Sequence, residues 1–66
     1  MKSYRFECKV TYPETENVWL AQTFAEAVSQ VECQLDDPDS ILGFVTELDS
    51  KRIPIHSTCI EPKRGC

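Results

Sequence analysis

The chain has 66 residues, a net charge of −4 and a hydrophobic fraction of 41%. This length suits one domain of marginal stability, and so small a core leaves no room for the ~300–1,000 Å³ cavity of a typical small-molecule enzyme. The acidic balance excludes a general nucleic-acid binder, because phosphate binding depends on clustered Lys and Arg.

The sequence indicates a cytoplasmic protein. Its first residues carry charges where a signal peptide requires an apolar stretch, and no run approaches the ~18 apolar residues of a membrane helix. In the cytosol the four cysteines would be mostly reduced thiols. The mild acidity would favour a basic partner, although it would equally serve to keep the protein in solution.

Two strands are predicted at the beginning of the chain. Residues 3–12 alternate between apolar and polar side chains, which is typical of a strand with one buried and one solvated face. A turn at 13–17 begins with Pro13, and the short apolar segment 18–21 is expected to return as the second strand of a hairpin. The core-facing side chains of the first strand are expected to be Tyr4, Phe6, Cys8, Val10 and Tyr12.

A helix is predicted to begin at Thr23, which forms a capping box with Glu26. It is expected to end before residues 36–39, since Pro38 disfavours helical geometry in the residue before it. Apolar residues at helical spacing form one stripe, and polar residues occupy the opposite side. The stripe consists of Phe24, Ala27, Val28, Val31 and Leu35, and the opposite side carries Glu26, Ser29, Gln30 and Cys33.

Two further strands are expected at 40–48 and 52–60, the second at a sheet edge because Pro54 cannot donate to a neighbouring strand. The order β-β-α-β-β predicts an α+β fold with a four-stranded antiparallel sheet in the order 2-1-3-4 and one helix packed on one face. Residues 1–60 form a single domain in this interpretation, and residues 61–66 form a flexible C-terminal tail.

No catalytic or metal-binding arrangement is found in the sequence. The four cysteines include no Cys-x-x-Cys pair, and His56, Cys59 and Cys66 would lack a fourth metal ligand. His56 also has Ser57 beside it, but successive strand residues point to opposite faces. Two glycines are too few for a phosphate loop. We therefore expect no enzyme, no cofactor and no metal site, while pairing of Cys59 with Cys66 stays open.

An acidic cluster is the first candidate for a partner-binding surface. Asp36, Asp37 and Asp39 follow the end of the helix, where the helix dipole disfavours anions, and such a costly arrangement points to function. With Glu32 and Glu26 from the helix, they would form a patch that docks on Lys and Arg of a partner. The alternative interpretation is that the three aspartates only form a solvated loop between the helix and the next strand.

The outer face of the sheet is the alternative surface. Arg5 and Lys9 are expected to point outward from the first strand, and Trp19 would add an aromatic side chain if it also faces outward. Basic residues interleaved with an aromatic can hold single-stranded nucleic acid on an open sheet. Glu7 lies between the two basic residues and weakens this prediction.

The strand–helix junction resembles that of small phage and mobile-element anti-defence proteins, including some anti-CRISPR proteins that block type I surveillance complexes. The junction reads Val18-Trp19-Leu20-Ala21-Gln22-Thr23-Phe24-Ala25-Glu26-Ala27, and a hairpin similar to residues 41–60 follows. The resemblance is architectural, extends to Ile60 and carries over no functional residue. It implies stoichiometric inhibition of a host protein or ribonucleoprotein with a basic surface. Direct nucleic-acid binding and a homodimer through an edge strand, 18–22 or 52–60, are the alternatives.

Overall fold

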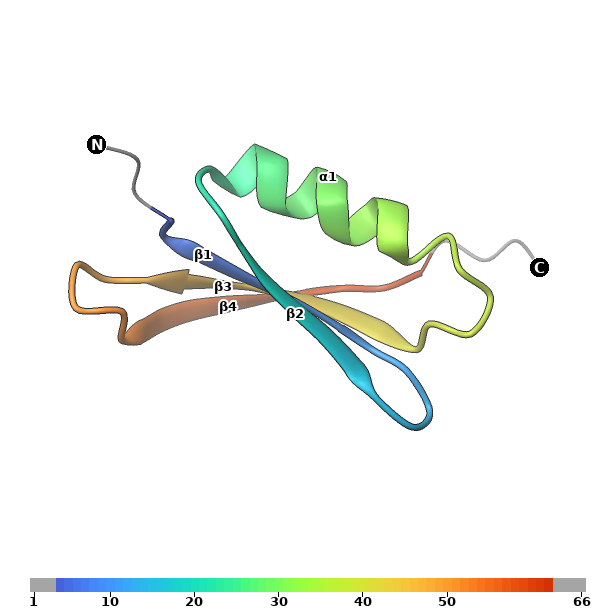
Figure 1. Ribbon diagram of the computed structural model, residues 1–66. Coiled ribbons are helices and arrows are strands. Elements are labelled where there is room, and N and C mark those ends of the chain that lie inside the picture. Colours follow the sequence, from blue (N-terminus) through green and yellow to red (C-terminus); the bar gives the residue numbers. More distant parts are fainter. Residues whose placement is uncertain (1–3, 63–66) are drawn as a thin grey trace.

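A computed structural model describes residues 4–62 of the protein, which form four strands and one helix in the order β-β-α-β-β (Figure 1). The sheet is antiparallel with the strand order β2-β1-β3-β4, so the predicted α+β fold is confirmed. Residues 63–66 of the predicted tail lie outside the described residues. The elements are β1 (Phe6–Thr11), β2 (Glu16–Ala21), α1 (Phe24–Gln34), β3 (Leu42–Leu48) and β4 (Pro54–Ile60).

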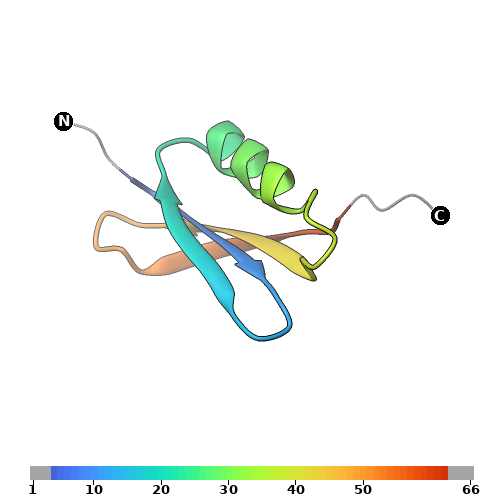
Figure 2. The same cartoon turned by 45° about the vertical axis from the view of Figure 1, so that its right-hand side comes forward.

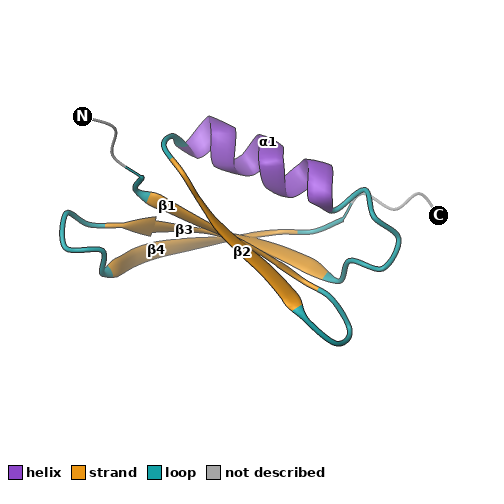
Figure 3. Ribbon diagram, viewed as in Figure 1, coloured by secondary structure: helices purple, strands orange, loops and turns teal. Residues whose placement is uncertain are grey.

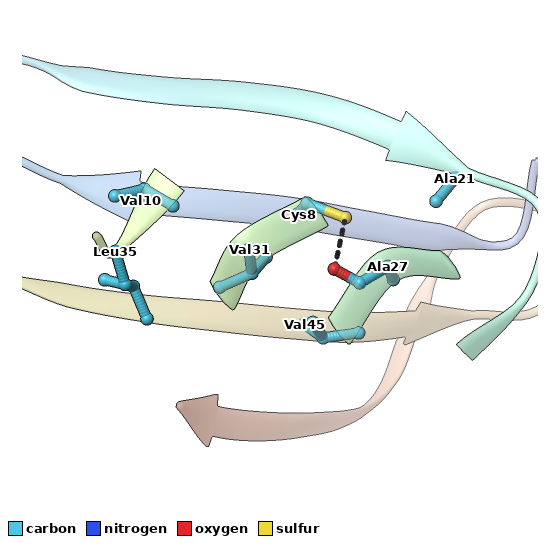
Figure 4. Packing of buried hydrophobic residues seen from close by; sticks show 7 residues of the cluster. All are labelled: Cys8, Val10, Ala21, Ala27, Val31, Leu35 and Val45. Carbon is cyan, nitrogen blue, oxygen red and sulfur yellow. Dashed lines mark hydrogen bonds between the residues drawn. The ribbon is translucent and has the colours of Figure 1, made fainter. Parts of the chain in front are cut away.

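The helix α1 lies across one face of the sheet, and no described element covers the opposite face (Figures 2 and 3). The core fills the space between these two layers (Figure 4). Strand β4 contributes no fully buried side chain, although Ile60 packs against the core at its edge. The buried core residues are Cys8, Val10, Ala21, Ala27, Val31, Leu35 and Val45.

The alternation predicted for the first strand is present in β1. Cys8 and Val10 are fully buried, and Phe6 packs partly buried against the core, whereas Tyr4 precedes the strand and is exposed. The hairpin differs from the prediction, because β2 begins at Glu16 rather than at residue 18. The reason is a short turn, which is closed by a hydrogen bond of 2.8 Å from the Tyr12 amide to the Thr15 carbonyl. Pairing between β1 and β2 begins directly after this turn.

The predicted capping box begins α1. The Thr23 hydroxyl accepts from the Glu26 amide at 3.1 Å, and the Glu26 carboxylate accepts from the Gln22 amide at 3.0 Å, one residue before the cap. Both bonds satisfy amides that would otherwise lack a partner at the helix start. The capping box therefore fixes where the chain leaves β2 and enters the helix.

Gly43 allows the second half of α1 to approach the sheet closely. It is buried on β3, and a Cβ atom there would collide with Val31 Cγ1 and lie 3.1 Å from Leu35 Cδ1. The helix therefore ends directly above the beginning of β3. This close approach positions the loop that connects the two elements.

The topology gives the molecule two distinct ends, and its longest dimension is 41 Å. The β1–β2 turn, the α1–β3 loop and the end of β4 meet at one end, on the right in Figure 1. The beginning of β1, the beginning of α1 and the β3–β4 turn meet at the other end. Residues far apart in the sequence are thus brought together at each end.

Candidate binding surface

Acidic side chains from four segments gather at one end of the molecule, which we call the acidic end. A hollow of about 320 Å³, the helix-side hollow, is lined by Glu32, Asp36 and Glu61. A second hollow of about 380 Å³, the turn-side hollow, is lined by the β1–β2 turn with Glu14 and by Asp39. The acidic end consists of Glu14, Glu32, Asp36, Asp37, Asp39 and Glu61.

The loop of the acidic end is held in shape by its own hydrogen bonds. The Asp37 carboxylate accepts from the Asp39 amide at 2.9 Å. The hydroxyl of the buried Ser40 donates to the carbonyls of Asp37, at 2.6 Å, and Leu35, at 3.2 Å. Asp37 therefore has a structural role in the loop, whereas Asp36 and Asp39 present exposed side chains to solvent.

Three of the four described Lys and Arg residues lie at the end of the molecule opposite the acidic end. Arg5 precedes β1, and Lys51 and Arg52 occupy the β3–β4 turn, all at the opposite end of the molecule. Lys9 on β1 pairs with Glu16 on β2 at 3.3 Å. Lys63 and Arg64 follow in the sequence but lie outside the described residues. Glu26 and Asp49 lie at that opposite end as well, so its charge is mixed, whereas no described Lys or Arg lines the two hollows of the acidic end.

Glu26 is separated from the other residues predicted for the acidic patch. Its carboxylate is engaged at the first turn of α1, at the opposite end of the helix from Asp36. Sequence analysis did not identify Glu14 and Glu61 as members of the patch, although both lie at the acidic end. No local signal marks these two residues, because the sheet order alone brings them to the loop.

The outward orientation considered for Trp19 is wrong. Trp19 pairs with the buried Cys8 across β1 and β2, so its side chain faces the helix, where the indole N–H donates to Gln30 Oε1 at 2.6 Å. The apolar run 18–21 shows no alternation, and this is why the sequence left its orientation open. The structure therefore does not bring an aromatic side chain beside Arg5 and Lys9 on the outer face.

The outer face of the sheet is more apolar than the sequence suggested. Val18 and Leu20 are exposed there, and the strand register places Phe44 in the same row as Val18 and Lys9. The ion pair between Lys9 and Glu16 neutralises the charge of this row. This face is therefore a weaker phosphate-binding surface than predicted.

The described cysteines differ in exposure. Cys8, Cys33 and Cys59 are free thiols, and only Cys8 is buried. Burial, assisted by the nearby charges of Glu26 and Glu7, raises the pKa of Cys8 to about 11. Within residues 4–62 no group of His, Cys, Asp and Glu side chains is arranged to hold a metal ion.

Comparison with protein-family models, with curated proteins and with solved structures found no match. Among the described residues, no helix is both long and apolar enough to cross a membrane.

Proposed function

We propose that this protein is a non-enzymatic binding protein whose acidic end docks on a basic surface of a partner protein. The observation that carries the proposal is the gathering of carboxylates from four separate segments, with the described cations placed elsewhere. Complementary charge of this kind steers association and selects the partner. The partner's lysine or arginine side chains would contact exposed carboxylates of the acidic end, among them Glu14, Asp36 and Asp39.

The partner class that fits best is a host-defence protein or ribonucleoprotein complex. Such proteins hold nucleic acid with clustered Lys and Arg, and an acidic surface competes for the same side chains. The resemblance to phage anti-defence proteins supports this class, and the expected result of binding is stoichiometric inhibition. The proposal places the protein in the cytosol, where exposed thiols such as Cys33 stay reduced.

The test compares a charge-reversed acidic end with a matched control. Asp36→Lys combined with Asp39→Lys reverses two exposed carboxylates and leaves the structural Asp37 in place. Glu7→Lys combined with Glu47→Lys makes the same change in net charge on the sheet, away from the acidic end. Circular dichroism first establishes that both variants are folded.

Proteins retained from an extract of the encoding organism are identified, and their affinity for each purified variant is then measured by calorimetry at low and high salt. We expect the acidic-end variant to bind about tenfold more weakly or worse, and the control to bind like the wild type. Affinity of the wild type should fall as salt rises. Equal affinity of the wild type and the acidic-end variant would contradict the proposal.

A further inference from the structure

Strand β4 is an edge strand that is exposed on both faces. Every residue from Pro54 to Ser57 is exposed, and Cys59 is exposed as well. The core is built from α1 and the other three strands, so the helix leaves β4 largely uncovered. Ile53 and Ile55 are 53% and 59% exposed, respectively, and residues 53–60 contain no Lys, Arg, Asp or Glu.

The usual protection of a sheet edge is confined to the beginning of β4. Proline, a bulge and charged side chains are the common devices that prevent edge-to-edge pairing. Pro54 and the irregularity between Glu47 and Leu48 both lie at the first residues of the strand. From His56 to Ile60 none of these devices is present, so the outward backbone groups are open to another strand.

Charged residues flank β4 on both sides. Asp49, Lys51 and Arg52 come before the strand, and Glu61 comes just after it, followed in the sequence by Lys63 and Arg64. Glu61 also lines the helix-side hollow with Glu32 and Asp36. Beside a reversed copy of the strand, Arg52 of one copy would come near Glu61 of the other.

We propose that β4 pairs antiparallel with β4 of a second copy of this chain, with the two-fold axis at Ser57. The two four-stranded sheets then form one continuous sheet. This register sets Ile53 opposite Glu61 of the other copy, so that Arg52 comes near that carboxylate. The antiparallel two-fold arrangement repeats each contact, as in other symmetric dimers.

This inference goes beyond the proposed function and does not rest on it. The dimer uses the β4 side of the acidic end, where Glu61 lies. The turn-side hollow, with Glu14 and Asp39, lies toward the opposite edge of the sheet and stays accessible. A partner could therefore still bind there, and failure of either proposal leaves the other standing.

The first test is sedimentation equilibrium of the full chain from low to high micromolar concentration, with a reductant that prevents disulfide links between copies. Ser57→Lys places like charges beside each other at the axis and is expected to weaken the dimer about tenfold or more. Leu20→Lys is the matched control, because it adds the same charge to the exposed face of the other edge strand, beside Glu7. It should leave the dimer unchanged.

A charge exchange tests the antiparallel arrangement. Arg52→Glu should weaken the dimer, because it sets two carboxylates near each other across the interface. Adding Glu61→Arg in the same chain should restore the dimer, because the introduced Glu of one copy then lies near the introduced Arg of the other. Loss without restoration would overturn the register proposed here. Thermal unfolding of each variant establishes that a loss of dimer is not a loss of fold.

Amide hydrogen exchange of the unaltered chain gives a measurement that needs no variant. Exchange in β4 should slow as concentration rises, while exchange in β2 should not, because only β4 gains hydrogen-bond partners. A monomer at every concentration, or protection confined to β2, would overturn the proposal.

Discussion

At the scale of single residues, Cys8 links the sequence pattern to a measurable property of the folded chain. Its position in the alternating strand predicted burial, and the structure places its side chain in the core beneath α1 (Figure 4). The thiol lies 3.9 Å from the Ala27 carbonyl, to which it can donate weakly. A thiolate would lose hydration there and meet the charges of Glu26 and Glu7. Folding therefore favours the protonated thiol.

The predicted consequence is a loss of stability in alkali. The pKa of Cys8 rises from 9.0 in the unfolded chain to about 11 in the folded one. The stabilisation of the folded chain by the protonated Cys8 thiol is complete below pH 9.0 and is lost as the pH rises toward about 11. The free energy of unfolding should decrease by an amount of the order of 2 kcal/mol over this range. Urea unfolding across this range measures the decrease. Cys8→Ala should flatten it, and an equal pH slope in both proteins would contradict the assignment.

At the scale of elements, periodicity decided what the sequence could predict. Residues 3–12 alternate and α1 has both a capping box and an apolar stripe, so most of the buried faces of β1 and α1 were predicted, although Phe24 at the start of the stripe is 48% exposed. β2 has a short apolar run without alternation, and its facing was settled only by pairing with β1. Trp19 turned toward α1 for this reason, where it meets Gln30.

The approach of α1 to β3 is a second property that periodicity could not show, and it depends on Gly43. Gly43→Ala should destabilise the fold by about 1–3 kcal/mol, because the added methyl group collides with Val31 and crowds Leu35. Combining it with Val31→Ala should restore part of this loss relative to the sum of the two single changes. Urea unfolding of the wild type, the two single variants and the double variant measures the coupling free energy between the two positions. Additive effects, or a stable Gly43→Ala variant, would show that the contact is not tight.

At the scale of the whole molecule, the gathering of carboxylates at the acidic end follows from topology. The aspartates after α1 were visible in the sequence, but Glu14 and Glu61 join them only because the sheet order brings the β1–β2 turn and the end of β4 to the same end as the α1–β3 loop. Such long-range neighbours leave no periodic signal in a single sequence. The same topology places Lys51 and Arg52 at the opposite end, so the acidic end receives no compensation from them.

This concentration of charge should cost stability. Asp36 follows the C-terminal end of α1, where the helix dipole disfavours anions, and it lies near Glu32 and Glu61. Asp36→Asn with Asp39→Asn should therefore raise the free energy of unfolding by about 0.3–1 kcal/mol at low salt. The gain should shrink at high salt, because screening weakens the repulsion between exposed charges.

Urea unfolding at two salt concentrations measures this gain, and Glu16→Gln is the control. That change removes the ion pair with Lys9, so it should be neutral or should destabilise by less than about 1 kcal/mol. If the Asp36→Asn/Asp39→Asn variant is more stable but no longer binds the partner protein, the carboxylates are retained for binding at the expense of stability. A gain that persists at high salt would instead point to loop geometry, and no gain would mean that the acidic end carries no electrostatic strain.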